Sequence, residues 1–128
     1  MRRRPLLGMG TALAAVALLG LTGCTQPIYN VSQHPFTSPG TLAGRTSQIQ
    51  HAAAGLGWQT TVIRPGMIRA TLNLRTHVAV TEITYNEQVF SILYVDSTNL
   101  QYDGASIHKN YNGWIQNLER AINLRPPG

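Results

Sequence analysis

Histidine and cysteine are the side chains of this chain of 128 residues that most often carry chemistry. The four histidines are widely separated, and no two have the spacing that a metal site on a helix or strand uses. They stand at His34, His51, His77 and His108. The sequence contains no G-x-S-x-G, H-E-x-x-H, P-loop or dinucleotide-binding motif. We therefore predict no metal ion and no cofactor, and we assign no catalytic residue.

One pair of residues could still provide acid–base catalysis, so an enzymatic function is kept as an alternative. His108 or His77 with Asp96 would supply an imidazole and a carboxylate to a small periplasmic hydrolase. Short polar side chains in this part of the sequence also suit turns and helix caps, which are their usual roles in loops. The hydrolase is therefore the alternative hypothesis, and a binding or structural module is the leading one.

The single cysteine, Cys24, closes the stretch L-L-G-L-T-G-C. It follows three arginines and an uncharged run from Leu6 to Leu19, which is shorter than the ~20 residues of a membrane-spanning helix. The basic start, the short apolar run and the tetrad L-T-G-C resemble the signal sequence and lipobox of bacterial lipoproteins. The resemblance implies a lipoprotein signal peptide over residues 1–23, with cleavage between Gly23 and Cys24.

The same resemblance makes Cys24 the site of lipidation. In that family the sulfur receives a diacylglyceryl group and the new amino terminus is commonly acylated as well, for example with palmitate. Two or three acyl chains hold a protein firmly on a bilayer, whereas one chain binds reversibly. Thr25 stands where an aspartate would favour the inner membrane, so we expect the outer membrane, with the protein facing the periplasm.

The charge of the chain is concentrated in its first residues. Ten basic and five acidic residues give a formal net charge of +5. Arg2, Arg3 and Arg4 leave with the signal peptide, so the mature chain has a net charge of +2. A positive charge this small gives no basis for binding nucleic acid.

Residues 24–40 contain three prolines, no charged residue and no sustained periodicity. This composition predicts a flexible tether between the lipidated cysteine and a small domain over residues 41–128. The domain is expected to begin with a helix, because Leu42 and Ile49 share a stripe at helical spacing and Gly57 suits the end of a helix.

Four strands are expected to follow this helix. The dipeptide at 65–66, P-G, is a strong turn signal. Residues 67–85 contain neither Pro nor Gly, and a single strand of that length would run about 60 Å, too long for a domain of this size. We therefore place further reversals at residues 75–76 and 86–87, which gives an antiparallel meander.

A wide apolar stripe at helical spacing predicts a second helix near the C-terminus, with Ser106 as its N-cap. The stripe comprises Ile107, Tyr111, Trp114, Ile115, Leu118 and Ile122. The expected fold class is therefore two-layer α+β. An antiparallel sheet of about four strands would carry the N-terminal and C-terminal helices on one face.

The strand alternation places five branched apolar residues on the outer face of this sheet, which is the candidate binding surface. They are Val78, Val80, Val89, Leu93 and Val95, joined by His108 and Asn112 at the polar edge of the last helix. An envelope protein or a second copy of the chain would cover such a patch. A register shifted by one residue would instead make the five apolar residues the core.

Three stretches of the domain resemble small proteobacterial lipoproteins of unassigned function: L-G-W, P-G-M-I-R-A-T-L and I-H-K-N-Y-N-G-W-I. No catalytic residue comes with that resemblance. The expected function is that of a membrane-anchored cell-envelope lipoprotein, bound to the lipid bilayer through acylated Cys24, that acts as a binding or structural module.

Overall fold

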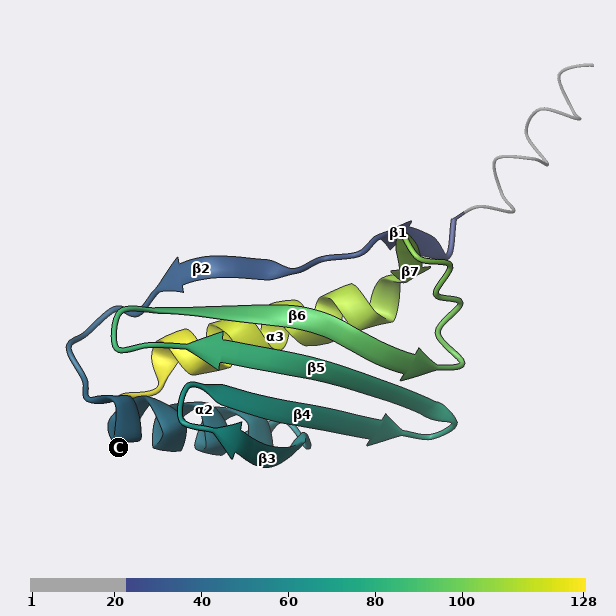
Figure 1. Ribbon diagram of the computed structural model, residues 1–128. Helices are drawn as coiled ribbons and strands as arrows, with labels where there is room; N and C mark the ends of the chain where they lie inside the picture. Colours follow the sequence, from purple (N-terminus) through teal and green to yellow (C-terminus); the bar gives the residue numbers. More distant parts are fainter. Residues whose placement is uncertain (1–22) are drawn as a thin grey trace, which may run out of the picture.

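The computed structural model describes residues 23–128 (Figure 1). The predicted signal peptide, apart from Gly23, lies outside these residues. The elements in chain order are β1 (Thr25–Pro27), β2 (Val31–Pro35), α2 (Leu42–Gly55), β3 (Gln59–Arg64), β4 (Met67–Leu74), β5 (His77–Tyr85), β6 (Val89–Thr98), β7 (Ser106–His108) and α3 (Lys109–Leu124).

The main sheet is antiparallel and has five strands in the order β2-β6-β5-β4-β3. β1 and β7 form a separate two-stranded sheet. Both helices lie against one face of the five-stranded sheet and leave its other face open (Figure 1). The α+β class and the meander from β3 to β6 are confirmed, and the sheet has one strand more than expected.

The hairpin between β4 and β5 turns within two residues. Leu74 pairs with His77, and Arg75 in the turn adopts a φ of 57°. A left-handed backbone costs a residue other than glycine about 1 kcal/mol, which the long ladder of pairs on either side of the turn offsets. The reversal predicted at residues 75–76 is therefore confirmed, although its residues do not favour such a turn.

Alternate residues of the central strands face the helices and form the core. Ile68 of β4, Ile83 of β5 and Phe90 of β6 are completely buried, as are Ile115 and Leu118 of α3. The predicted strand register is therefore correct, and the apolar residues on the opposite face of the sheet are not the core.

A buried guanidinium joins three segments at one end of the domain. Arg45 of α2 donates hydrogen bonds to the backbone oxygens of Ser38 and Glu87 and to the side-chain oxygen of Gln48. Its guanidinium carbon lies 3.9 Å from the centre of the Phe36 ring. Burying a charged group is costly unless its donors are satisfied, so this set of partners fixes the chain that leads into α2.

The tether predicted over residues 24–40 is wrong, because much of this segment is folded. β1 pairs with β7, and β2 forms an edge of the main sheet by pairing with β6. Val31 of β2 is buried in the core. β2 was not predicted because it is short and its register shifts between Val31 and His34. This shift removes the alternation of buried and exposed residues that is typical of a strand.

The side chain of Asn112 holds the link between β1 and β2 against α3. Its oxygen accepts a hydrogen bond of 2.9 Å from the backbone N–H of Tyr29, and its nitrogen donates one of 2.9 Å to the backbone oxygen of Pro27. Asn112 is only 6% exposed. Two backbone groups of the incoming chain thus depend on one side chain.

We predict that Asn112→Ala lowers the free energy of unfolding by about 2 kcal/mol, because the N–H of Tyr29 and the C=O of Pro27 would lose their partner. Urea denaturation measures this change. Asn110→Ala, an exposed position two residues earlier, is the matched control and should leave the midpoint unchanged. Equal midpoints for all three proteins would show that the segment is not bound to α3.

Candidate functional site

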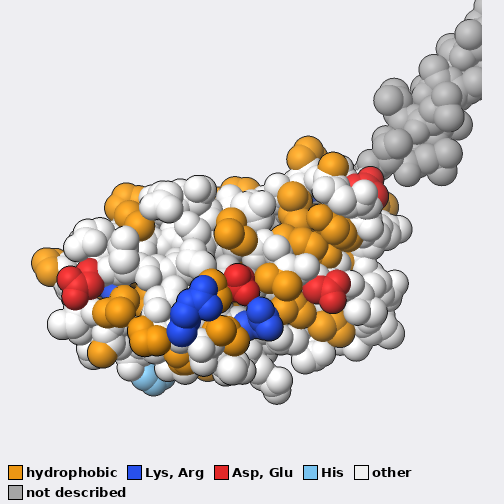
Figure 2. All heavy atoms as spheres, viewed as in Figure 1, with side chains coloured by type: hydrophobic (Ala, Val, Ile, Leu, Met, Phe, Trp, Pro, Cys, Tyr) orange, Lys and Arg blue, Asp and Glu red, His pale blue; other side chains and the backbone are white. Residues whose placement is uncertain are grey.

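The outer face of the five-stranded sheet is the candidate binding surface. Val78, Val80 and Val89 are partly exposed on it, and Leu93 and Val95 are 40% and 42% exposed. None of the described elements covers this face, and Figure 2 shows apolar side chains distributed across it. The structure thus brings together the five apolar residues that the strand pattern assigned to one surface.

A β-bulge in β6 adds a carboxylate to this surface. Val80 pairs with Asp96, whereas the next residue, Thr81, pairs with Tyr94, so Val95 is the extra residue. Directly opposed residues share a face, which places Asp96 on the outer side with Val80. Simple alternation from Leu93 would have placed Asp96 on the core side, and no local feature of the sequence signals the bulge.

An ion pair lies among the apolar side chains of the outer face. Arg69 of β4 and Glu82 of β5 are directly paired across the strands, with 2.9 Å between the guanidinium and carboxylate groups. Basic and acidic side chains lie side by side in the middle of the face in Figure 2. Such an exposed pair contributes well under 1 kcal/mol to stability. Because the two charges of this pair cancel, the outer face combines apolar and charged side chains without a strong net charge of either sign.

His108 and Asn112 do not belong to this face. His108 ends β7 in the small sheet, and its Nδ1 accepts a hydrogen bond of 3.1 Å from the backbone N–H of Asn110, so it caps α3. Ser106, the predicted N-cap, lies in β7 instead. The side chain of Asn112 is buried and occupied by Tyr29 and Pro27.

The residues of the hydrolase alternative serve local structure. The Nδ1 atom of His77 lies 2.7 Å from the backbone oxygen of Asn99, and a carboxylate oxygen of Asp96 accepts the N–H of Ser97 at 2.8 Å. Within residues 23–128, no hydrogen bond joins Asp96 to His77 or to His108. In the same range no three His, Cys, Asp or Glu side chains cluster closely enough to hold a metal ion.

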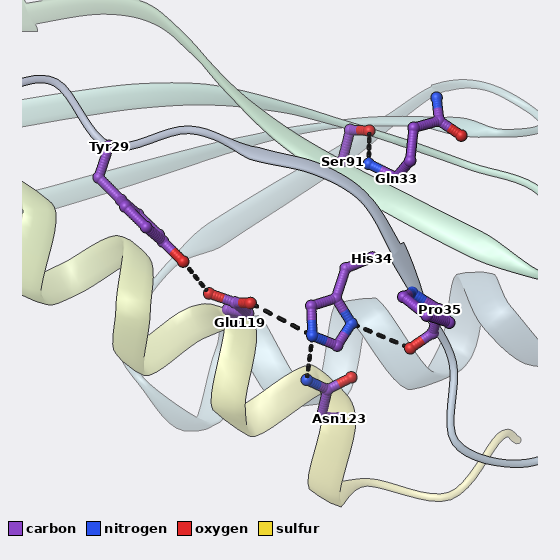
Figure 3. A network of polar contacts seen from close by, with 7 residues as sticks. All are labelled: Tyr29, Gln33, His34, Pro35, Ser91, Glu119 and Asn123. Atoms are coloured by element: carbon purple, nitrogen blue, oxygen red, sulfur yellow. Dashed lines mark hydrogen bonds and ion pairs between the residues drawn. The ribbon is translucent and has the colours of Figure 1, made fainter.

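A second polar arrangement connects β2 to α3 (Figure 3). The hydroxyl of Tyr29 donates to Glu119 at 2.6 Å, and the other carboxylate oxygen of Glu119 lies 3.4 Å from Nε2 of His34. Asn123, one turn further along α3, approaches the same nitrogen at 3.4 Å. No pattern in the sequence indicates this cluster, because its members come from opposite ends of the domain.

The imidazole of His34 has no nitrogen left for a substrate. Its Nδ1 donates to the backbone oxygen of Pro35 at 2.9 Å, since a carbonyl oxygen can only accept, and its Nε2 faces Glu119 and Asn123. The cluster therefore fastens β2 to α3. His34, which lies within the predicted tether, is part of the folded domain.

The hydrogen bond to Glu119 raises the pKa of the Tyr29 phenol, with smaller contributions from burial and from the negative charge of the carboxylate. The phenol is protonated at neutral pH and donates to the carboxylate. At high pH two negative groups would face each other.

Comparisons of the chain with protein-family models, with curated proteins and with solved structures found no match. The class of the domain therefore rests on its own architecture: a two-layer α+β domain with one sheet face covered by helices and the other open. Neither helix among residues 23–128 has the length and apolar character that would allow it to cross a bilayer.

We predict that Tyr29→Phe lowers the free energy of unfolding by about 1 kcal/mol at pH 7, because it removes a hydrogen bond to a charged group. The folded pKa of Tyr29 lies above the usual 10.0, so the bond stabilises below that pH and is lost as the pH rises through the raised pKa. The difference between the two proteins should therefore shrink in alkaline solution.

Urea denaturation at neutral and at alkaline pH measures this difference. Tyr102→Phe is the control, because Tyr102 is exposed and its hydroxyl makes no hydrogen bond within the described residues. A loss of stability for Tyr29→Phe that is the same at both pH values would contradict the assignment.

Proposed function

We propose that this chain is a lipid-anchored binding module of the bacterial cell envelope, held on the membrane by acylated Cys24. The observation that carries the proposal is the tetrad L-T-G-C behind a basic and apolar leader, with Cys24 exposed directly ahead of the first strand. An attachment group on this sulfur would meet no steric obstacle from the folded domain. With Thr25 in the following position, the outer membrane facing the periplasm is the proposed location.

The position of Cys24 relative to the fold supports an anchor close to the domain. The backbone oxygen of Cys24 accepts a hydrogen bond of 3.0 Å from the N–H of Lys109, and the next residue, Thr25, already pairs with His108. Acyl chains on Cys24 would therefore leave the protein beside β1 and β7. No slack chain separates them from the domain, so anchoring would also restrict the orientation of the sheet.

The open sheet face supports a binding role. The five apolar residues of this face form a surface that a partner would remove from water. Each Å² of apolar surface buried would contribute about 25 cal/mol to binding. An envelope protein with a matching apolar face is the partner we propose. No arrangement of His77, His108 and Asp96 in the structure favours hydrolysis over binding.

We predict that Cys24→Ala abolishes labelling of the protein with radioactive palmitate in growing cells, because the chain has no other cysteine. The variant should remain uncleaved or leave the membrane fraction. Gln26→Ala, an exposed neighbour in β1, is the matched control and should be labelled normally. Labelling that persists in Cys24→Ala would refute the anchor.

We predict that Leu93→Asp weakens binding of an envelope partner by roughly tenfold or more, since a buried unpaired carboxylate is costly at an apolar interface. Val80→Asp should act in the same direction. The readout is the set of proteins retained by the detergent-solubilised lipoprotein. Asn117→Asp, on the exposed side of α3, is the control for added charge. Unchanged retention by both face variants would exclude this surface.

A further inference from the structure

The two edges of the five-stranded sheet differ in their capacity to pair with another strand. β2 is the edge beside β6, and it carries three features that oppose pairing. Its register shifts between Val31 and His34, Gln33 has a φ of 52°, and Pro35 has no N–H to donate. The N–H of Gln33 is also bound to the hydroxyl of Ser91 at 2.9 Å. Bulges and prolines of this kind protect edge strands from association.

β3, the opposite edge, has one of these features, because its register shifts between Val62 and Arg64. From Gln59 to Val62 its pairing with β4 is uninterrupted. It runs from Gln59 to Arg64 without Pro, Gly, Lys or an acidic residue, and its centre consists of the β-branched residues T-T-V-I. It pairs with β4 on one side alone, and no backbone hydrogen bond from any other described segment reaches it. An edge with an uncharged, β-branched centre is the type that pairs readily with a further strand.

Apolar groups also lie exposed along β3. Val62 is 42% exposed, and Ile63 is 41% exposed. Val62 pairs with Ile68 and so faces the helix layer, where it borders a shallow hollow beside α2. The hollow is lined by Leu42, Ala43, Thr46, Val62 and Pro65. A strand added to this edge would therefore gain side-chain contacts as well as backbone hydrogen bonds.

We propose that β3 pairs antiparallel with β3 of a second copy of this chain, joining two five-stranded sheets into one continuous sheet. The strand is complementary to itself. With a two-fold axis at Thr61, Thr60 lies opposite Val62 and Gln59 opposite Ile63. With the axis at Val62, Thr61 lies opposite Ile63. Neither register brings Arg64, the one charged residue of β3, next to its own copy, so no like charges oppose each other.

Symmetry makes this pairing compatible with a membrane anchor and with the open sheet face. Antiparallel pairing of identical strands requires a two-fold axis perpendicular to the sheet. The outer faces of both copies then lie on the same side and form one larger surface. The two Cys24 residues lie at the same height along the axis, so one bilayer perpendicular to the axis would receive both anchors. The pairing itself does not depend on lipidation.

Cysteine scanning of β3 in the full-length protein tests the proposal. Variants that retain Cys24 are oxidised in intact membranes, and variants that lack it are oxidised in whole-cell extracts. Single cysteines replace Thr60, Thr61, Val62 and Ile63, each with Cys24 retained and each again in a Cys24→Ala background to exclude bonds through Cys24. Opposed residues in an antiparallel pair have Cβ atoms about 5 Å apart, within reach of a disulfide. Mild oxidation should give a disulfide-linked dimer that is most abundant for the residue on the axis. Ser32→Cys on β2 is the control and should stay monomeric.

A charge exchange at the axis residue provides the second test. Lys at that position in both copies, or Glu in both, should give a monomer in sedimentation equilibrium, while coexpression of the Lys and Glu forms should restore the dimer. Disulfide dimers at none of the four positions, or a wild-type protein that sediments as a monomer, would overturn the proposal. Failure of palmitate labelling alone would refute the anchor and leave the dimer unaffected.

Discussion

The side chain of Asn112 binds two backbone groups of the segment that enters the domain, the N–H of Tyr29 and the C=O of Pro27. These hydrogen bonds direct the chain from β1 along α3, so that Val31 reaches the core and β2 reaches β6. An apolar side chain at position 112 would leave both backbone groups without partners. The buried amide of Asn112 therefore contributes to closure of the domain on this side, together with the contacts of Glu119 and the pairing of β2 with β6.

Because β1 is bound, the position of Cys24 relative to the sheet is determined by the fold. β1 pairs with β7 immediately before α3, and the open sheet face lies on the side of the sheet away from both helices. In the proposed lipoprotein, these constraints link three properties: the site of attachment, the orientation of the domain and the surface that is presented. A tethered domain would leave the last two undetermined.

The parts of the fold that follow from local periodicity were predictable from the sequence. Alternation along residues 67–85, and the maximum length of a strand in a small domain, located the turn at Arg75. Helical spacing located the buried face of α3 from Tyr111 to Ile122, whereas Ile107 of the same predicted stripe lies in β7. The five apolar residues of the outer face were assigned correctly for the same reason. The bulge that carries Asp96 outward left no local sign, because a bulge changes which residues pair without changing composition.

The N-terminal strands were not predictable in this way. β2 and the residues before it are bound to distant parts of the chain. β2 pairs with β6, Tyr29 contacts Glu119, and His34 contacts Glu119 and Asn123, the side-chain contacts reaching across 85 to 90 positions. The prolines and the lack of periodicity indicated a tether. These local features do not report hydrogen bonds from a distant side chain, such as those that Asn112 makes to the backbone of this segment. His108 in place of Ser106 as the helix cap has a similar origin, because the pairing of β1 with β7 extends the strand to His108.

The chain is folded from the residue after Cys24 onward, and amide hydrogen exchange tests this property most directly. The N–H groups of Ile28, Tyr29 and Phe36 are bound to Ala105, Asn112 and Gln88, respectively, at 2.9 to 3.0 Å. We predict that all three exchange orders of magnitude more slowly than the same amides in an unfolded peptide. Exchange of these three amides at the rate of an unstructured chain, with β4 and β5 protected, would contradict the account.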